Sequence, residues 1–339
     1  MDINRLWSRG ARFLGTKYAI MAGAMSWVSE HNLVAAISNA GGFGVLACGS
    51  MDAKLLRAEI KLTQLKTNKP FGVNLITMHP DILELAAVCV EEKVSHVVLA
   101  GGLPKFSYME FLKNSDIKIL CFAPTLSLAK RLIKLGADAL IIEGMEAGGH
   151  IGPVSTAVLA QEILPHITEV PVFVAGGIGR GEMVANYLCM GASGCQLGTK
   201  FVCAYESIAH QNFKNMFIKS NSRDAMVSSQ VDPDFSVIPV RALSNKATAE
   251  FSKAQIDAIS KFKEGVISKS EAQLNIEKFW AGALRRAVIE GDIDTGSVMA
   301  GQSVGMVEKE QSAQEIIEEL VEQAMKSLEN ITVELKSAV

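Results

Sequence analysis

Residues 137–150 read Ala-Asp-Ala-Leu-Ile-Ile-Glu-Gly-Met-Glu-Ala-Gly-Gly-His, and this stretch indicates the fold more directly than any other. A short apolar run, Ala137–Ile142, leads into small residues, which is typical of a buried parallel strand that opens into a loop. The small residues Ala147–Gly149 allow backbone N–H groups to approach a ligand closely, and His150 places an imidazole beside the same space. The stretch therefore predicts a strand followed by a ligand-binding loop that carries an acid/base.

Apolar strands alternate with amphipathic helices from Tyr18 to Ala204 at a period of roughly 25 residues, the pattern of βα units in a parallel sheet. Helical patterns lie near residues 29–39, 52–66, 80–92, 105–114, 126–135, 155–165 and 181–190, and Gly136 and Gly191 fit the ends of two of them. Eight candidate strands with helices between them predict an α/β fold, the TIM (β/α)8 barrel. These strands are Tyr18–Ala24, Phe43–Cys48, Phe71–Ile76, Val94–Ala100, Lys118–Ala123, Ala137–Ile142, Val170–Ala175 and Gly194–Cys203.

A doubly wound open sheet is the alternative architecture. It is disfavoured because no G-x-G-x-x-G follows the first strand. Residues suited to chemistry instead follow strands throughout the chain, and in a barrel all those strand ends meet on one face.

The sequence divides into three predicted parts. Residues 1–220 form the barrel, and residues 221–301, where the βα rhythm stops, form a small helical lid or substrate subdomain with polar helices over Lys246–Glu277. Residues 302–339 pack back on the barrel through an acidic helix, Ser312–Leu328, whose apolar residues are Ile316, Leu320 and Met325.

Composition excludes several classes of protein. No apolar run approaches the roughly 18 residues of a membrane span, and the first residues lack the apolar core of a secretory signal, so we expect a cytoplasmic protein. A net charge of −3 gives no field for nucleic acid or anionic membrane. The six cysteines show no metal-binding spacing, so they are expected to be reduced and mostly buried, and no metal site is predicted.

Small and polar residues end several of the predicted strands. Ala22, Gly23, Ala24 and Met25 follow the first strand and fit either backbone contact with a flat ring system or a tightly packed turn. Asn74 ends the third strand among apolar neighbours, where its amide requires a hydrogen-bonding partner. That partner could be a ligand or an internal polar network.

The seventh and eighth strands predict a phosphate site. Glycines at two neighbouring strand ends, each close to the start of a helix, can form an anion-binding nest of backbone N–H groups, and barrel enzymes commonly bind a ligand phosphate there. The alternative is that these glycines serve only packing. The absence of G-x-x-x-x-G-K-[ST] argues against a nucleotide triphosphatase. The residues concerned are Ala175, Gly176 and Gly177 on one side and Gln196, Gly198 and Thr199 on the other.

His150 is the candidate catalytic residue, because an imidazole directly after a Gly-Gly pair at a strand end can transfer a proton near pH 7. Glu143 and Glu146 flank the same loop; one of them could orient a ligand, or both could be solvated or helix-capping carboxylates. The remaining histidines are expected in helical or exposed positions and form no metal-binding pair: His31, His79, His96, His166 and His210.

Taken together, these motifs resemble the FMN-dependent family that contains nitronate monooxygenases (2-nitropropane dioxygenases) and the flavin-type enoyl-ACP reductase II of bacterial fatty-acid synthesis. Residues 143–152, 282–284 and 291–302 look closer to the reductase, whereas 231–237 departs from it, since a shorter, histidine-containing stretch is expected there. The resemblance covers nearly the whole chain through Ile20–Met25, Gly41–Gly44, Pro70–Asn74, Glu143–Gly152, Ala175–Ile178 and Gln196–Phe201.

The resemblance implies FMN across the barrel mouth against Ala22–Met25, near Asn74, with its phosphate at Gly176, Gly177, Gly198 and Thr199 and His150 facing the substrate. Glu143, Gly148, Gly149, Ala175 and Gln196 complete the implied cofactor site. In the reductase interpretation NADH or NADPH is the reductant, and the substrate is a small-molecule or acyl-carrier-protein-bound enoyl thioester. The alternatives are a nitronate monooxygenase that uses O2 and, more weakly, a non-catalytic FMN-binding sensor. The resemblance also implies a homodimer, and an acidic carrier protein implies a basic patch at the mouth, for which the candidates are Lys278, Arg285 and Arg286.

Overall fold

The computed structural model describes residues 2–235 and 237–337; Met1, Ser236, Ala338 and Val339, which fall in the three predicted parts, lie outside the described residues. Its centre is a barrel of parallel strands in the order β1-β9-β8-β6-β5-β4-β3-β2. A parallel bridge between Met21 and Phe43 closes the barrel, and the Phe43 amide donates to the Ile20 carbonyl at 2.9 Å. The predicted TIM barrel is confirmed. Its strands are β1 (Ile20–Ala22), β2 (Val45–Ala47), β3 (Gly72–Ile76), β4 (His96–Ala100), β5 (Lys118–Phe122), β6 (Ala139–Glu143), β8 (Val172–Ala175) and β9 (Gly194–Leu197).

Helices alternate with these strands because each amphipathic segment starts and stops at a recognisable signal. The side chains of Asp52 and Thr125 accept hydrogen bonds from the first turns of α4 and α7, as N-caps do. Gly136 and Gly191 adopt φ values of 103° and 104° just after α7 and α9, where a side chain would be strained. The helices around the barrel are α3 (His31–Asn39), α4 (Ala53–Lys66), α5 (Ile82–Glu91), α6 (Phe106–Lys113), α7 (Leu126–Lys134), α8 (Thr156–Ile163) and α9 (Gly181–Cys189).

The amino-terminal end of the barrel is closed from inside by Phe13 of α2 (Ser8–Leu14), which follows α1 (Ile3–Leu6). The Phe13 carbonyl lies 3.0 Å from Nε2 of His96 and accepts a hydrogen bond from Nζ of Lys118 at 2.8 Å. Its ring also lies against that of Phe173. The prediction that His96 is helical or exposed is wrong, because this residue begins β4 and is buried in the plug. Burial lowers the pKa of His96 to about 4, so it stays neutral and structural.

The eighth barrel strand is shorter than predicted. β9 ends at Leu197, and residues 199–202 form one turn of helix, α10 (Thr199–Val202), followed by α11 (Gln211–Lys219). The run Lys200–Cys203 is buried in this turn rather than in the sheet, and a short buried run looks alike in either state. The consequence is that Gly198 and Thr199 lie beyond the strand, at the barrel mouth.

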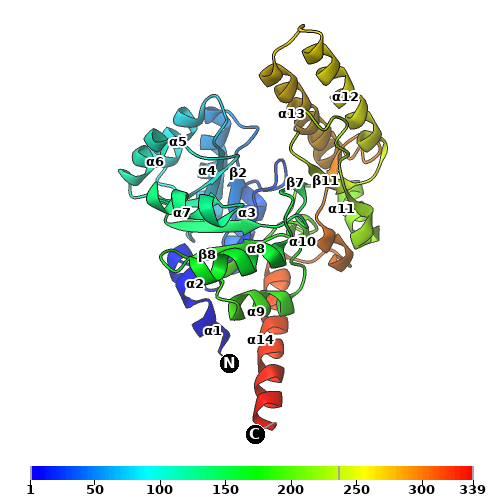
Figure 1. Ribbon diagram of the computed structural model, residues 1–339. Helices are drawn as coiled ribbons and strands as arrows, with labels where there is room; N and C mark the ends of the chain where they lie inside the picture. Colours follow the sequence, from blue (N-terminus) through cyan, green and yellow to red (C-terminus); the bar gives the residue numbers. More distant parts are fainter. Residues whose placement is uncertain (1, 236, 338–339) are drawn as a thin grey trace.

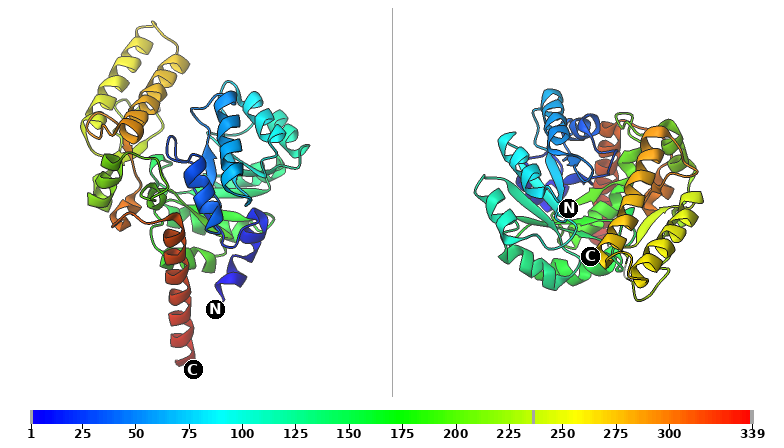
Figure 2. Two further views of the ribbon diagram at one scale, coloured as in Figure 1. Left: turned by 180° about the vertical axis from the view of Figure 1, so that it is seen from behind. Right: turned by 90° about the horizontal axis from the view of Figure 1, so that it is seen from above.

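Residues 225–299 build a second structural unit with its own small sheet and hydrophobic core. Helices α12 (Lys246–Lys263) and α13 (Lys269–Arg285) form a hairpin that projects from one end of the molecule, opposite the end of α14 (Ala313–Ser337) (Figure 1 and Figure 2). The sequence did not predict the sheet of this unit, which contains β10 (Ala225–Val227), β11 (Val240–Leu243) and β12 (Val298–Met299). The second core contains Phe235, Val237, Val240, Phe251, Ala258, Ile259, Ala272, Ile276 and Trp280.

The chain then returns to the barrel through a π-helix, Arg286–Glu290, a 3-10 turn, Gln302–Met306, and the long helix α14 (Ala313–Ser337). α14 packs against α9 and α3, and the amide of Gly181 donates to Oε1 of Gln323 at 2.8 Å. Ile316 and Leu320 are buried, but Met325 is exposed because the buried face of α14 continues through Ala324 and Leu328 instead.

Two expectations from composition can be compared with the described residues. None of their helices is both long and apolar enough to cross a membrane. Five of the six cysteines are buried, and Cys189 is exposed.

Candidate functional site

Three polar side chains face the barrel interior near the carboxyl ends of its strands. Residues paired between parallel strands point to the same face, and alternate residues of a strand share a face. Asn74 follows Gly72 by two residues, and Gly72 pairs with His96 of the interior plug. Glu143 pairs with Ala175, which pairs with Gln196. Phe173, whose ring contacts Phe13 of the plug, pairs with the residues two positions before Glu143 and two positions before Gln196. The side chains of Glu143 and Gln196 therefore point to the same interior face as Phe173.

Glu143 has the chemistry expected of a ligand-binding group. Its side chain is half-buried, and among the described residues its carboxylate has no hydrogen-bond or ion-pair partner. Burial raises its pKa to about 7, since the charged form is poorly solvated inside the barrel. The side-chain amide of buried Gln196 also has no partner among the described residues, and Asn74 donates to the Val98 carbonyl at 3.0 Å. The interior therefore presents polar groups that a ligand could satisfy.

The loop after β1 lies beside the end of β9. A Cβ on Gly23 would lie 3.5 Å from Nε2 of Gln196, and one on Gly198 would lie 3.6 Å from Sδ of Met25. The loop is fixed by Ser29, whose hydroxyl donates to the Gly23 carbonyl at 3.1 Å and accepts from the Met25 amide at 3.0 Å. The backbone of Ala22–Met25 thus borders the same opening as Gln196 and Gly198.

The loop after β6 lies beside the ends of β8 and β9. Gly177 adopts φ 71°, and a Cβ there would lie 2.9 Å from Cβ of Glu146. Gly148 packs against the backbone of Gly301, whose amide donates to Oγ1 of Thr199 at 3.0 Å. The predicted glycine-rich segments at the ends of β1, β6, β8 and β9 therefore form one side of the rim at this end of the barrel.

The two carboxylates of the loop have different tasks. Oε2 of Glu146 accepts hydrogen bonds from the amide and the hydroxyl of Thr156, both at 2.9 Å, at the start of α8. Glu146 is thus the capping carboxylate that the sequence left as one alternative. Glu143 is the one available to a ligand.

His150 lies outside the barrel sheet. It forms the two-residue strand β7 (Gly149–His150), which pairs antiparallel with β11, His150 opposite Val240 and Gly149 opposite Arg241. The Ile151 amide extends this pairing by donating to the Pro239 carbonyl at 3.0 Å. The exposed imidazole is therefore placed by the insert, which the sequence did not reveal because the two strands are far apart in the chain.

Sequence reasoning also missed Trp27, in the loop after β1. This residue has φ 67°, a strained value for a bulky side chain, and its buried Nε1 has no hydrogen-bond partner among the described residues. The guanidinium of Arg285 lies 5.7 Å from the Trp27 ring centroid, which joins α13 of the insert to the barrel mouth. The only available signal was a tryptophan directly after a small-residue motif.

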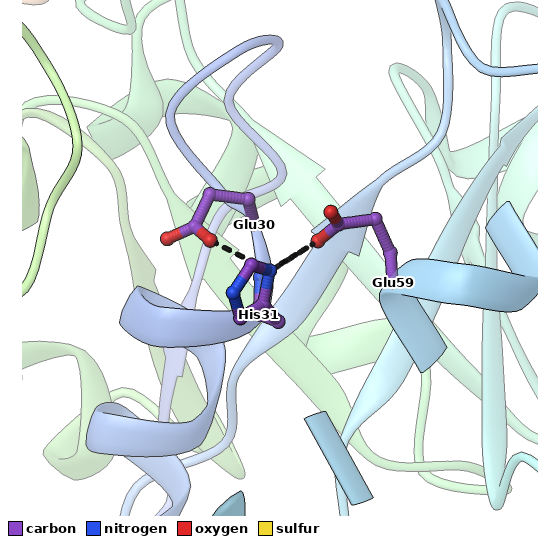
Figure 3. A group of neighbouring side chains, drawn as sticks. All are labelled: Glu30, His31 and Glu59. Carbon is purple, nitrogen blue, oxygen red and sulfur yellow. Dashed lines mark hydrogen bonds and ion pairs between the residues drawn. The ribbon is translucent and has the colours of Figure 1, made fainter. Parts of the chain in front are cut away.

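One cluster has the composition of a metal-ligand set but a structural explanation (Figure 3). Nδ1 of His31 lies 2.9 Å from Oε2 of both Glu30 and Glu59. Glu30 also caps α3 by accepting from the amides of Asn32 and Leu33. The cluster joins the start of α3 to α4, and these contacts occupy its ligand atoms.

Comparison with known proteins assigns the chain to a family. The family model described as nitronate monooxygenase matches residues 8–92 and 86–323, nearly the whole chain. The chain belongs to the nitronate monooxygenase family.

The proteins that this chain resembles are named for different activities. A "(3aS,4S,5R,7aS)-5-hydroxy-7a-methyl-1-oxo-octahydro-1H-indene-4-carboxyl-CoA dehydrogenase" of Rhodococcus jostii is 28% identical over 93% of this chain and 95% of its own. A nitronate monooxygenase of Paraburkholderia phytofirmans is 28% identical over 70% of this chain and 76% of its own. The solved structure of FabK from Thermotoga maritima is 34% identical and covers 96% of this chain and 98% of its own, with a TM-score of 0.85.

These relatives are oxidoreductases, and so is this chain. Nitronate monooxygenases and FabK are flavin-dependent, and the barrel mouth fits such a cofactor. The backbone at Gly23, Gly177 and Gly198 carries no side chain that would block a flat ring or a phosphate. Glu143 and Gln196 offer polar groups without protein partners to the ring's heteroatoms.

Proposed function

We propose that this member of the nitronate monooxygenase family is an FMN-dependent, NAD(P)H-dependent reductase of enoyl thioesters, with enoyl-acyl-carrier-protein as the favoured substrate. The observation that carries the proposal is the match to FabK, an enoyl-ACP reductase II, which extends over barrel, insert and α14 at 34% identity. The Rhodococcus relative, named as acting on a CoA thioester, supports the same substrate class.

FMN, when bound, would relay a hydride from the nicotinamide to the β-carbon of the enoyl thioester. The chain's own residues bind and orient. The backbone of Ala22–Met25 would lie along the ring, and Gly176, Gly177, Gly198 and Thr199 would receive the phosphate. Asn74, Glu143 and Gln196 would hydrogen-bond the polar edge of the ring from inside the barrel, while Gly148, Gly149 and Ala175 leave room for it.

His150 would handle the proton. Its imidazole stands on the rim, at the end of the loop that also borders the proposed cofactor site, and can hold a proton for the α-carbon of the thioester or stabilise the enolate oxygen. General acid assistance of this kind contributes about 10²–10⁴-fold to a rate. Antiparallel pairing with β11 restrains the backbone that carries His150, which supports a catalytic role over mere ligand binding.

The insert would receive the acyl carrier. Lys278 is exposed on α13, and Arg285 is exposed over Trp27 with Glu290 as its ion-pair partner. Arg286 is half-buried and donates to the Thr295 carbonyl at 3.0 Å, so its charge also has a structural task. An acidic carrier would therefore meet Lys278 and Arg285 first. The homodimer implied by the family resemblance belongs to the same proposal.

A second candidate function is oxidation of alkyl nitronates with O2. The family model and the Paraburkholderia relative carry that name. In this case His150 would bind the nitronate or take a proton from the nitroalkane, and no nicotinamide would be needed.

Anaerobic flavin spectroscopy separates the two. The proposal predicts roughly one FMN per chain, loss of flavin absorbance on adding NADH or NADPH, and recovery on adding a crotonyl thioester. A flavin that stays oxidised with both nicotinamides, in a protein that consumes O2 with an alkyl nitronate, would establish the second candidate instead.

A further inference from the structure

Arg241 is a buried cation without an acidic partner. It lies in β11, is 3% exposed, and among the described residues forms no ion pair. Desolvation lowers its pKa, and the charge of Glu146 acts in the opposite direction. Burying a guanidinium that is satisfied mainly by carbonyl groups is costly, and an apolar residue of similar size would stabilise such a position more. A task other than stability is therefore indicated.

The contacts of Arg241 identify that task. Its Nε donates to the Met145 carbonyl at 3.0 Å, and its Nη1 donates to the Ala225 carbonyl of β10. In the small sheet the backbone of Arg241 also lies opposite Gly149. One residue of the insert thus contacts the loop after β6 near its start, at Met145, and near its end, immediately before His150.

The rest of that loop is held by the barrel side. The amides of Gly144 and Met145 donate to the carbonyls of Ala175 and Val154 at 3.1 and 2.8 Å. The Gln302 amide donates to the Glu146 carbonyl at 2.9 Å. The last residues of the loop instead pair with β11. Arg241 therefore connects the part of the loop held by the barrel with the part paired to β11. Its planar guanidinium can donate to the Met145 and Ala225 carbonyls at once, which a lysine ammonium on a flexible stem does poorly.

We propose that Arg241 is a positioning residue that fixes His150 over the barrel mouth by joining the small sheet of the insert to the loop after β6. The inference rests on the proposed role of His150 and goes beyond it, because it assigns the geometry of the imidazole to the insert. A displacement of about 1 Å in a catalytic group can cost roughly 100-fold in rate. Loss of the Arg241 fork should therefore lower kcat about 10–100-fold while leaving bound FMN unchanged.

The test compares Arg241→Met with Lys214→Met. Lys214 is also a buried cation, with Nζ donating to the Ala204 carbonyl at 2.8 Å, but its ion-pair partner is Glu310 and it has no contact with the loop after β6. The first measurement is the imidazole resonance of His150 in NMR spectra, assigned by its loss in His150→Ala. We expect it to move in Arg241→Met and to stay in place in Lys214→Met. This measurement stands even if the protein reduces no enoyl thioester.

The second measurement is a double-mutant cycle on kcat. If Arg241 acts through His150, adding Arg241→Met to His150→Ala lowers kcat by no more than about twofold further. Arg241→Lys, which keeps the charge and the stem, serves if Arg241→Met does not fold, and it should lose less activity. An unmoved His150 resonance in the Arg241 variants, or a full further loss of kcat in the double variant, would overturn the proposal. Absence of any reductase activity together with a moved resonance would overturn the proposed function and leave the positioning role intact.

Discussion

The barrel rim and the insert contribute to one site in different ways. The rim is made of strand ends and glycines whose neighbours are fixed by the barrel, such as Gly198 beside Met25. The insert contributes β11, which pairs with the strand of His150, and Arg285, which covers Trp27. The proposed cofactor binding and the placement of the proposed acid/base, His150, are therefore expected to be separable properties, and mutations can test each one alone.

His150→Ala is expected to give the largest difference between FMN binding, which it should leave intact, and turnover, which it should lower. Because His150 is exposed and belongs to β7, its loss should leave the barrel and its FMN intact while kcat falls by about 10²–10⁴-fold. The measurements are flavin content after gel filtration and steady-state turnover of a crotonyl thioester. Turnover equal to that of the parent protein would show that His150 has only a structural role. It would contradict the proposal that the insert places a catalytic residue.

Two buried tryptophans test whether the units are also separate in stability. Trp280 belongs to the core of the insert, whereas Trp7 belongs to the core of the barrel. Replacing either by alanine removes a large packed side chain, at a cost of about 3–5 kcal/mol. In thermal unfolding followed by flavin fluorescence, Trp280→Ala should unfold the insert before FMN is released, and Trp7→Ala should lower the temperature of FMN release itself. A single coincident transition in Trp280→Ala would contradict the comparison.

A pH effect distinguishes the two carboxylates of the loop after β6. The folded protein raises the pKa of Glu143 to about 7, so this residue takes up a proton on folding between its unfolded pKa of about 4.5 and pH 7. Burial of Glu143 therefore does not lower the free energy of unfolding below pH 4.5, where the residue is protonated in both states. As the pH rises from 4.5 to 7, the free energy of unfolding falls by up to about 3 kcal/mol, at roughly 1.4 kcal/mol per pH unit.

Glu143→Gln should accordingly make the FMN-free protein more stable than the parent at pH 8, with a smaller difference at pH 5. Glu146→Gln, the matched control, weakens the contact with Thr156 and should destabilise at both pH values. Denaturant unfolding at the two pH values measures the free energies. The prediction fails if Glu143→Gln shows the same pH dependence as the parent.

The smallest expected effect comes from paired glycines. Gly177 on the rim and Gly191 after α9 both have positive φ, so alanine at either should cost about 1–2 kcal/mol of strain. Only Gly177 borders the proposed phosphate position, and a Cβ there would also press on Glu146. Titration of the FMN-free protein should show weaker FMN binding for Gly177→Ala, by roughly 10-fold, and unchanged binding for Gly191→Ala. Equal FMN affinities in the two variants would place the phosphate elsewhere.

The rim could be predicted from sequence because its signals are local. Apolar runs ending in glycine mark strand ends, and the barrel geometry then brings Gly23, Gly177 and Gly198 to one face. Even there, periodicity alone could not distinguish the buried turn Thr199–Val202 from a continuing strand.

The insert could not be predicted in the same way because its signals are non-local. β7 has only two residues, and its partner β11 lies beyond most of the barrel, so no short-range pattern links His150 to Val240. No local pattern in the sequence indicates that the side chain of Arg241 is buried against the loop after β6. Helices α12 and α13 were predictable because helical periodicity is local, whereas the pairing of β11 with β7 was not.

The most direct test of the account follows the two half-reactions of the flavin by anaerobic stopped-flow absorbance in the parent protein and in His150→Ala. NADH or NADPH should reduce bound FMN at similar rates in both proteins, and a crotonyl thioester should reoxidise it quickly in the parent but about 10²–10⁴-fold more slowly in His150→Ala. Reoxidation at the same rate in both proteins, or a parent protein that binds no FMN, would contradict the account.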